Sequence, residues 1–539
     1  MRLPGKTHAR LFAAILIAAF AAIAPPRVAW AESRTEQQRN ADLLEKMARD
    51  DFGTLSPAEL KVVRGAPFRE LPWVGPDNNP DNPANDVAKG ASWGPERTIR
   101  AEILSWLCTE PDVARYIHPS GLGVAAAKIV GSFDLSYSKV TKPLTMLRCY
   151  MPDGVDLSHS QIESLELRKC ITGPIDGDLS MVNGDVAFRY GTYGPTSFFR
   201  SHIGGNLDCS GGIFHNSGQD AVSAIEASVL GDALFHDGFE TDGFVDFRLA
   251  RVGRSLSFND AHFVGNADNG LNAERSVVDG TFYWVDIKHT AKTQLDLENA
   301  RADSIWDDQK SWPAAGNLAL DGFTYNSFSG GPADSKRRLR WLNRQSSGYR
   351  PQPYRQLAKV LNDAGEESGS TEVLIAKQED LRRQGHLTRV DRAWNLMLEM
   401  TIGYGHRPLR ALWWILGFVV LGSFVFGWGH RAKLVTPTEA VAYEKFVATG
   451  APPPHYPPFN AFVYSLDHFI PVVDLSQGSY WRPNPEHTFK GVFRLGRRKI
   501  DLGYFPSTLL RWYLWVHILA GWTLTPLFFA GLSGLIRSD

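Results

Sequence analysis

Residues 129–140 read IVGSFDLSYSKV, and this stretch decides the fold. Its pattern is apolar, any, Gly, any, apolar, any, apolar, any, any, small, any, apolar. The pattern returns, whole or in part, at residues 155–162, 175–186, 203–214 and 252–263, and from residues 229 and 278. Such self-similarity is the sequence signature of a repeat architecture, in which neighbouring units bury a shared core.

The copies are 22 to 28 residues apart when they are aligned on the seventh position of the pattern. The aligned residues are Leu135, Leu157, Met181, Cys209, Phe235, Phe258 and Trp284. Alternating apolar and polar residues predict short strands, and about 20 to 28 residues make one turn of a parallel solenoid. The small residue two places before an apolar one resembles the five-residue step of pentapeptide repeats. We therefore predict a right-handed parallel β-solenoid over residues 126–330, with the aligned residues in its core.

A β-sandwich is the competing all-β fold. It requires hairpin turns about every 8 to 12 residues, and turn-forming dipeptides are not regularly spaced here. A solenoid also needs covered ends, because end strands expose unpaired backbone groups. We expect an N-terminal helical region and cap over residues 32–125, with a capped helix start at Ser56, and a helical connector over residues 331–406.

Residues 1–31 predict a secretory signal peptide. Three basic residues precede an uncharged apolar run at residues 11–24, and the sequence AWA at residues 29–31 supplies the small residues of a cleavage site. A permanent N-terminal anchor is the alternative, although this run is shorter than the roughly 20 residues that cross a bilayer. In both cases the following residues are exported.

Two further apolar segments predict membrane spans. Residues 411–429 and 512–536 contain no Asp, Glu, Lys or Arg, and aromatic residues lie near their ends. Pro526 is expected to kink the second span. Together they define a membrane domain over residues 407–539, with a connecting loop at residues 430–511.

Basic residues predict the orientation of these spans. Nine lie between residues 431 and 499, against five beside the outer ends of the spans. The five are Arg389, Arg392, Arg407, Arg410 and Arg537. Because basic loops stay in the cytoplasm, the connecting loop is expected inside and the solenoid outside. This prediction agrees with the signal peptide and indicates a periplasmic domain on the bacterial inner membrane.

Charge and cysteine content exclude several functional classes. The chain of 539 residues has a formal net charge of -1, so no overall field attracts nucleic acid, and we expect no nucleic-acid partner. No two of the four cysteines form a C-x-x-C motif, and this spacing excludes zinc ribbons and thioredoxin-type sites. Cys149 and Cys170 occupy comparable positions in adjacent coils, so they either form a disulfide or remain a reduced apolar column. Cys209 is expected in the core and inert.

Two glycine motifs have weak functional interpretations. Residues 121–126 fit a loose dinucleotide-binding loop, but a strand is expected after them instead of a helix. Residues 401–405 read TIGYG, similar to a potassium-channel filter, but they precede both spans. We expect the first motif to lead into the first coil and the second to form a turn beside the membrane.

The chain resembles a bacterial family of membrane-associated proteins with pentapeptide-like repeats, often labelled "membrane-associated oxidoreductase". The residues that carry this resemblance are 203–210 (IGGNLDCS), 352–358 (QPYRQLA), 403–410 (GYGHRPLR) and 530–537 (AGLSGLIR). The resemblance implies a β-solenoid joined to two membrane helices. It brings no catalytic residues to positions of this chain.

An oxidoreductase requires a redox centre, and a b-type haem is the one such group whose ligands this sequence could supply. His517, inside the last apolar run, would have to pair with His406 or His430 as an axial ligand. The simpler interpretation is that each of these histidines lies at the membrane interface near a helix end and binds no haem. We expect no cofactor.

Residues 459–475 are apolar but too short and too polar to span a bilayer. They contain Tyr464, Asp467, His468 and Asp474. An interfacial segment and the pore loop of an oligomeric ion channel are the two interpretations.

A column of outward carboxylates, Asp134, Asp156 and Asp208, is expected on the solenoid surface. Some β-helices cleave polysaccharides with such groups, but the other repeats place Ser180, Leu234, Ser257 and Tyr283 at this position. No nucleophile, base and orienting group can be linked by spacing. We therefore expect a binding or scaffolding module for a protein or an envelope polymer, with an oxidoreductase and a pore as alternatives.

Overall fold

The structure is a computed structural model that describes residues 27–79, 82–265, 269–289, 292–484, 488–495 and 498–535. The expected signal peptide at residues 1–31 lies almost wholly outside the described residues. The chain divides into two compact units, and the division follows Gly369.

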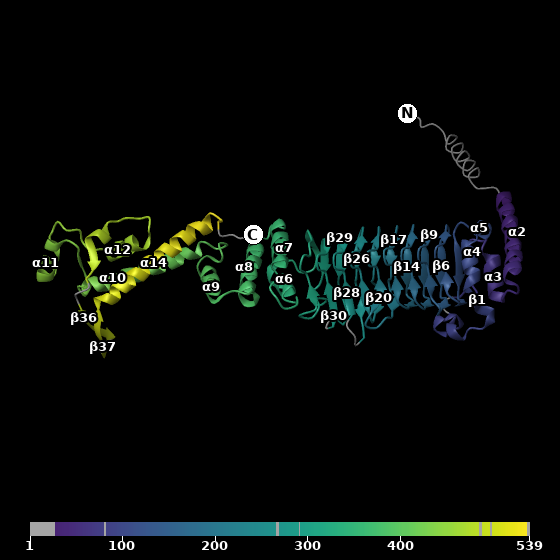
Figure 1. The fold of residues 1–539 in the computed structure, drawn as a ribbon, viewed down its shortest axis with the longest axis horizontal. Helices are drawn as coiled ribbons and strands as arrows, with labels where there is room; N and C mark the ends of the chain where they lie inside the picture. Colours follow the sequence, from purple (N-terminus) through teal and green to yellow (C-terminus); the bar gives the residue numbers. More distant parts are fainter. Residues whose placement is uncertain are drawn as a thin grey trace, which may run out of the picture. The chain divides into compact units, whose positions relative to one another are not determined.

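The first unit is a parallel β-solenoid, which confirms the prediction (Figure 1). From β2 onward, residues paired between successive coils are 20 to 27 positions apart, as for Gln161 with Met181 and Ile213 with Glu240. Each coil contributes short strands to four faces. The faces are a nine-stranded sheet, an eight-stranded sheet and the two rows of a sixteen-stranded sheet, which join at β29.

Most strands are short because each crosses only one face of a coil, whereas the eight-residue β29 pairs in both rows of the largest sheet. The nine-stranded sheet comprises β4 (Phe133–Asp134), β8 (Val155–Asp156), β12 (Ile175–Asp176), β16 (Thr196–Ser197), β20 (Asp220–Ser223), β24 (Phe244–Asp246), β28 (Asn269–Asn272), β30 (Thr293–Asp296) and β32 (Leu318–Ala319). The eight-stranded sheet comprises β1 (Thr98–Arg100), β3 (Lys128–Val130), β7 (Tyr150–Met151), β11 (Ile171–Thr172), β15 (Thr192–Tyr193), β19 (Ile213–Phe214), β23 (Glu240–Thr241) and β27 (His262–Phe263).

The largest sheet has two rows. The first row comprises β2 (Leu122–Ala125), β6 (Leu144–Leu147), β10 (Leu165–Arg168), β14 (Val186–Arg189), β18 (Leu207–Asp208), β22 (Ala233–Leu234), β26 (Leu256–Ser257), β29 (Val277–Trp284), β31 (Arg301–Asp307) and β33 (Ser327–Gly330). The second row comprises β5 (Lys139–Val140), β9 (Gln161–Ile162), β13 (Met181–Val182), β17 (His202–Ile203), β21 (Ser228–Val229) and β25 (Arg251–Val252), and it also ends on β29.

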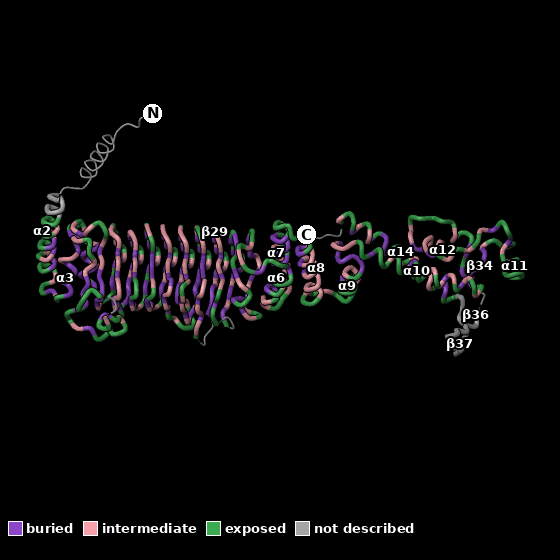
Figure 2. The backbone as a smooth tube through the Cα atoms, turned by 180° about the vertical axis from the view of Figure 1, so that it is seen from behind, coloured by how far each residue is buried: buried purple, intermediate pink, exposed green. Residues whose placement is uncertain are grey.

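The interior changes character along the stack. The first three coils bury Leu, Ile, Val, Met and Cys side chains with Phe133 as their one fully buried phenylalanine, whereas an unbroken series of aromatic contacts begins in the fourth coil. Its ring centroids are 4.9 to 5.6 Å apart along the path Phe188, Tyr193, Phe214, Phe239, Phe235, Phe258 and Trp284. Figure 2 shows the buried positions following the inside of the coils.

The expected place of Met181 in the core is wrong. Met181 is 48% exposed, because the copy at residues 175–186 is shifted against its neighbours. Gly177 occupies the interior position instead, and a Cβ atom there would lie 2.4 Å from Cε1 of Phe198. The Phe198 ring of the next coil therefore fills the space that Gly177 leaves empty in this one.

The corner after β32 has Gly322, with φ 77°, and the corners after the other eight strands of the nine-stranded sheet have a left-handed residue other than glycine. These residues are Tyr137, His159, Leu179, Arg200, Glu226, Leu249, Arg275 and Asn299, with φ between 53° and 60°. Few non-glycine residues adopt this conformation without support. The support is a hydrogen bond between coils: for example, the Tyr137 N–H donates to the Ser158 carbonyl at 3.0 Å.

Helices cover the N-terminal end of the stack (Figure 1). They are α2 (Arg27–Phe52), α3 (Pro57–Gly65), α4 (Ala101–Thr109) and α5 (Pro111–Ala114), with 3₁₀ turns η1 (Pro83–Asn85), η2 (Val87–Ser92) and η3 (Pro95–Arg97). The Arg97 guanidinium ties this cap to the first coil, because its Nε and Nη2 donate to the Ala126 carbonyl at 3.0 and 2.8 Å.

The capped start of α3 is confirmed. Ser56 Oγ accepts the Glu59 N–H, and the Glu59 carboxylate accepts the Ser56 N–H. Glu59 also accepts a hydrogen bond from Arg100 Nε at 2.8 Å. Burial opposes the charge of Glu59, but the hydrogen bonds from Arg100 and Ser56 outweigh it and hold the pKa of this carboxyl below its ordinary value.

Two helices cover the C-terminal end, α6 (Ser335–Leu342) and α7 (Pro351–Asp363). Arg338 of α6 is fully buried and binds Asp307 of β31 with both ends of its guanidinium, at 2.7 and 2.8 Å. The Phe328 ring lies 3.7 Å from the guanidinium carbon. This bidentate pair fixes the cap on the last coils.

The second unit is mainly helical. After α8 (Glu367–Gln384), which crosses the division between the units, it comprises α9 (Arg389–Ile402), α10 (Arg410–Arg431), β34 (Val435–Pro437), α11 (Ala440–Thr449), α12 (Ala461–Phe469), α13 (Gln477–Tyr480), β35 (Trp481–Pro483), β36 (Thr488–Leu495), β37 (Arg498–Pro506) and α14 (Ser507–Leu532). Helix α10 contains the first predicted span, and α14 contains residues 512–532 of the second. Both helices are long and apolar enough to cross a membrane.

Removing one partner of the buried Asp307–Arg338 pair should loosen the cap. We expect Arg338→Ala to cost about 3–5 kcal/mol of stability, because Asp307 then stays buried without its partner. Thermal unfolding and limited proteolysis of the purified full chain measure the effect. Arg200→Ala is the matched control, since Arg200 and Glu226 form an exposed pair, and we expect no change of the midpoint. Equal midpoints for the two variants would contradict the role of the buried pair.

Candidate functional site

The acidic column on the solenoid has a structural role. Asp134, Asp156 and Asp176 are neighbours in the nine-stranded sheet, and each carboxylate accepts the N–H of the residue two places on. Burial, with the nearby carboxylates of Asp178 and Asp156, raises the pKa of Asp176. The carboxylates thus stabilise the turns that lead into the left-handed corners.

The expected inclusion of Asp208 in this column is wrong. Asp208 belongs to the first row of the largest sheet, where it pairs with Ala187 and Leu234 and binds Arg189 Nε at 2.8 Å. All four faces alternate apolar and polar residues in the same way. The pattern in the sequence therefore does not tell one face from another.

The cysteines lie where the repeats place them. Cys149 and Cys170 are buried in adjacent coils as free thiols, and the Cys149 N–H donates to Cys170 Sγ at 3.4 Å. A disulfide between them in an oxidising compartment, one of the two interpretations of the sequence, stays a prediction. Cys209 is buried, and burial raises the pKa of its thiol, which disfavours the reactive thiolate.

A ridge of side chains follows the left-handed corners of the nine-stranded sheet. We call it the corner ridge and define it by Tyr137, His159, Leu179, Arg200, Glu226, Leu249, Arg275 and Asn299. The Tyr137 and His159 rings stack at 4.5 Å, and Arg200 pairs with Glu226 at 2.6 Å. Tyr137, Leu179 and Leu249, at the first, third and sixth of these corners, are exposed apolar groups. Strands of neighbouring coils are about 4.8 Å apart, so the ridge repeats on that scale.

The second unit exposes a girdle of large apolar side chains on α10 and α14. Trp413 is 75%, Phe424 73% and Leu519 66% exposed. Other exposed members are Leu412, Leu416, Leu421, Trp512, Val516, Trp522 and Phe529. Soluble monomers rarely expose contiguous apolar surface of this kind.

Helix α12 packs against both α10 and α14. Ser465 Oγ donates to the Val419 carbonyl of α10 at 2.8 Å and lies 3.2 Å from His517 Nε2 of α14. His517 Nε2 is also 3.0 Å from the Ser465 carbonyl. The His517 ring is thus fully buried where the three helices meet.

The three histidines considered for haem do not come together in the structure. The His517 ring faces Gly422, where a Cβ atom would lie 2.7 Å from its Cε1. His430 lies two turns further along α10, about 12 Å along the axis, and stacks on Phe459 at 4.4 Å. His406 precedes α10. His430 and His517 are therefore too far apart to ligate one iron.

The four residues considered for a pore lie in and after α12. Asp467 accepts the N–H groups of Leu475 and Gly478, and Asp474 accepts that of Ser476. Tyr464 is fully buried, and its ring stacks on His468 at 4.3 Å. The two carboxylates therefore fold the loop after α12 onto itself.

Both glycine motifs have structural roles, as expected. Gly121 precedes β2, and Gly123 lies within it, so no dinucleotide loop is formed. Gly403, with φ +53°, ends α9, and Tyr404 OH donates to Asn395 Oδ1 at 2.9 Å. Arg382 Nη1 of α8 donates to Tyr404 OH at 3.0 Å. The TIGYG segment is thus the turn between α9 and α10.

The sequence alone did not reveal two features of the second unit. One is Ser465, whose partners Val419 and His517 lie about fifty residues away on either side. The other is an apolar groove under α9. The apolar spacing along α9, with Leu396, Met397 and Met400 on one side, is the signal that indicates a buried or lipid-facing stripe.

Comparison with family models, curated proteins and solved structures gives no match for this sequence. Among the described residues, no group of three or more His, Cys, Asp and Glu side chains is placed to hold a metal ion.

Close packing at Gly422 should be needed to seat α12. A Cβ atom at Gly422 would lie 2.2 Å from Ser465 Oγ, whereas Gly417 of the same helix has open space. We expect Gly422→Leu to destabilise the unit by about 1–3 kcal/mol through overpacking, and Gly417→Leu to have no such effect. Thermal unfolding of the detergent-solubilised full chain measures both. Indistinguishable curves would contradict this packing.

Proposed function

We propose that this chain is a membrane-anchored binding or scaffolding protein, with its solenoid on the extracytoplasmic side of the bacterial inner membrane. The observation that carries the proposal is the exposed apolar girdle on α10 and α14. These helices have 22 and 26 residues, which suits the roughly 20 residues needed to cross a bilayer. Lipid, rather than water, is the solvent that such a surface requires.

The distribution of basic residues supports the orientation. The segment between the two helices is the more basic side, and it includes the antiparallel hairpin of β36 and β37. An N-terminal signal peptide also delivers the following domain across the membrane. Both arguments point to an exported solenoid.

The solenoid supports a binding role because its ends are closed and its sides are regular. Caps at both ends prevent stacking with further strands, so contacts with other molecules are left to the sides. The corner ridge offers exposed tyrosine and leucine side chains among charged groups. A protein or an elongated envelope polymer is the partner that suits a surface repeated once per coil.

Membrane insertion can be tested in native cells. We expect the chain to stay in the membrane after alkaline carbonate extraction, because α10 and α14 are surrounded by lipid. Protease added to spheroplasts should digest the solenoid and leave a protected fragment containing α10 to α14. Release by carbonate would contradict the anchor, and protection of the solenoid in intact spheroplasts would contradict the orientation.

Photo-crosslinking tests the corner ridge. A photoreactive amino acid at Tyr137, Leu179 or Leu249 should give a defined crosslinked product in intact cells. Tyr190 is the matched control: it is also left-handed and 50% exposed, like Leu249, but it lies at a different corner. Products at Tyr190 alone would move the binding surface to that corner, and the absence of products at all four positions would contradict the binding role.

A further inference from the structure

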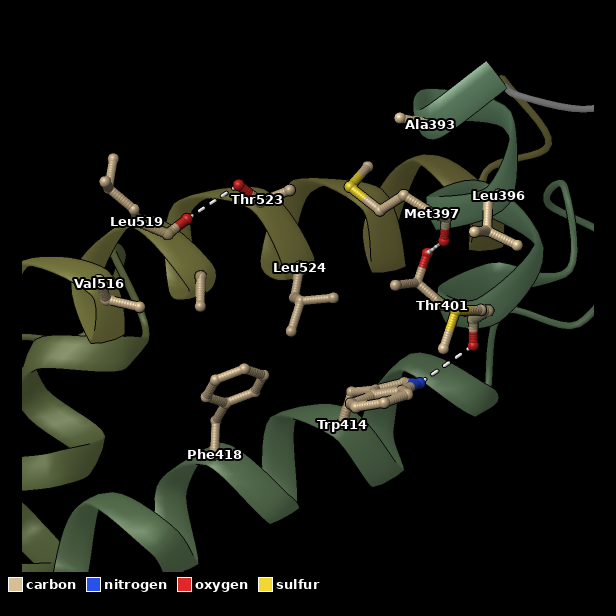
Figure 3. Close-up of a pocket in the computed structure, with 12 residues that line it drawn as sticks. Ala393, Leu396, Met397, Thr401, Trp414, Phe418, Val516, Leu519, Thr523 and Leu524 are labelled. Carbon is tan, nitrogen blue, oxygen red and sulfur yellow. Dashed lines mark hydrogen bonds between the residues drawn. The ribbon is translucent and has the colours of Figure 1, made fainter. Parts of the chain in front are cut away.

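An apolar groove of about 570 Å³ lies between α9, α10 and α14 (Figure 3). Its lining includes Leu396 and Met400 of α9, Trp414 and Phe418 of α10, and Leu519 and Leu524 of α14. Figure 3 shows the α9 side chains at one end of the groove and Val516 toward the other. The volume falls within the range of about 300–1,000 Å³ for small-molecule pockets.

The polar groups in the lining are already hydrogen-bonded. Thr401 Oγ1 donates to the Met397 carbonyl at 2.7 Å, and Thr523 Oγ1 donates to the Leu519 carbonyl at 2.8 Å. Trp414 Nε1 donates to the Met400 carbonyl at 3.0 Å, which also holds α9 on α10. With these donors satisfied within the protein, the groove favours a hydrocarbon over a polar ligand.

Arginines extend the groove-facing stripes of two helices. On α9 the lining residues Ala393 and Leu396 are preceded, one turn earlier, by Arg389 and Arg392. On α10 the residue one turn before Trp414 is Arg410. All three arginines are exposed, and none has an ion-pair partner among the described residues. Positive charge therefore lies just beyond the apolar lining.

We propose that this groove holds one acyl chain of an anionic phospholipid, with the phosphate at Arg389 and Arg392. The inference rests on the proposed membrane insertion and adds a specific lipid to it. Arginine suits a phosphate because its guanidinium donates two parallel hydrogen bonds. The exposed Val390 and Trp394 on another side of α9 fit a helix that lies at the membrane surface.

The proposal can be tested with the full chain in nanodiscs. The probe is phosphatidylglycerol with a photoreactive acyl chain, compared with phosphatidylcholine carrying the same chain. We expect labelling of the groove-lining residues of α9, α10 and α14, and preference for phosphatidylglycerol. Thr523→Trp fills the groove and should abolish this labelling. Val420→Trp, at an exposed position of α10 outside the groove, is the matched control and should retain it.

The head-group site is tested separately. The double variant Arg389→Gln, Arg392→Gln should lose the preference for phosphatidylglycerol by about fivefold for each arginine, while the acyl chain still labels the groove. Arg383→Gln, at an exposed arginine of α8, should leave the preference unchanged. Uniform labelling along α10 and α14, unaffected by Thr523→Trp, would overturn the lipid site alone. Release of the chain by carbonate extraction would overturn membrane insertion and the lipid site together.

Discussion

Hydrogen bonding between coils is the constraint on which the first unit depends. Each strand has only a few residues and finds its backbone partners in the coils before and after it, so no coil is stable alone. The same requirement explains the caps. At one end the Arg97 guanidinium satisfies the Ala126 carbonyl, and at the other the buried pair of Arg338 and Asp307 fixes a helix over the last coils. The hydrogen bonding between coils is thus the same along the stack, while the side chains that fill the interior vary from coil to coil.

The solenoid could be predicted from the sequence because alternation and repetition are local signals. The assignment of faces could not, because four faces share one alternation and differ only in the order in which the chain visits them. Met181 shows the limit. Its apolar character matches the pattern, but Gly177 holds the interior position of this coil, and Phe198 of the next coil fills the space beside it. Asp208 was assigned to the wrong column for the same reason.

The two long helices of the second unit were predicted because length and lack of charge suffice to identify them. The polar contact between them could not be predicted, because Ser465 of α12 reaches Val419 of α10 and His517 of α14 only when the three helices pack together. The burial of His517 depends on contacts with α10 and α12, which no local pattern in the sequence reveals. The groove under α9 likewise needs three helices in contact, which no single stretch of sequence reveals.

The change from an aliphatic to an aromatic interior makes the solenoid mechanically uneven. Aromatic rings bury more surface per residue than Val or Cys, and edge-to-face contacts add to this. In a linear array each coil depends only on its neighbours, so disruption travels coil by coil. Under tension the aliphatic coils near the N-terminus should fray first, while the phenylalanine-rich coils that lead along the chain toward the apolar helices persist as the last folded remnant.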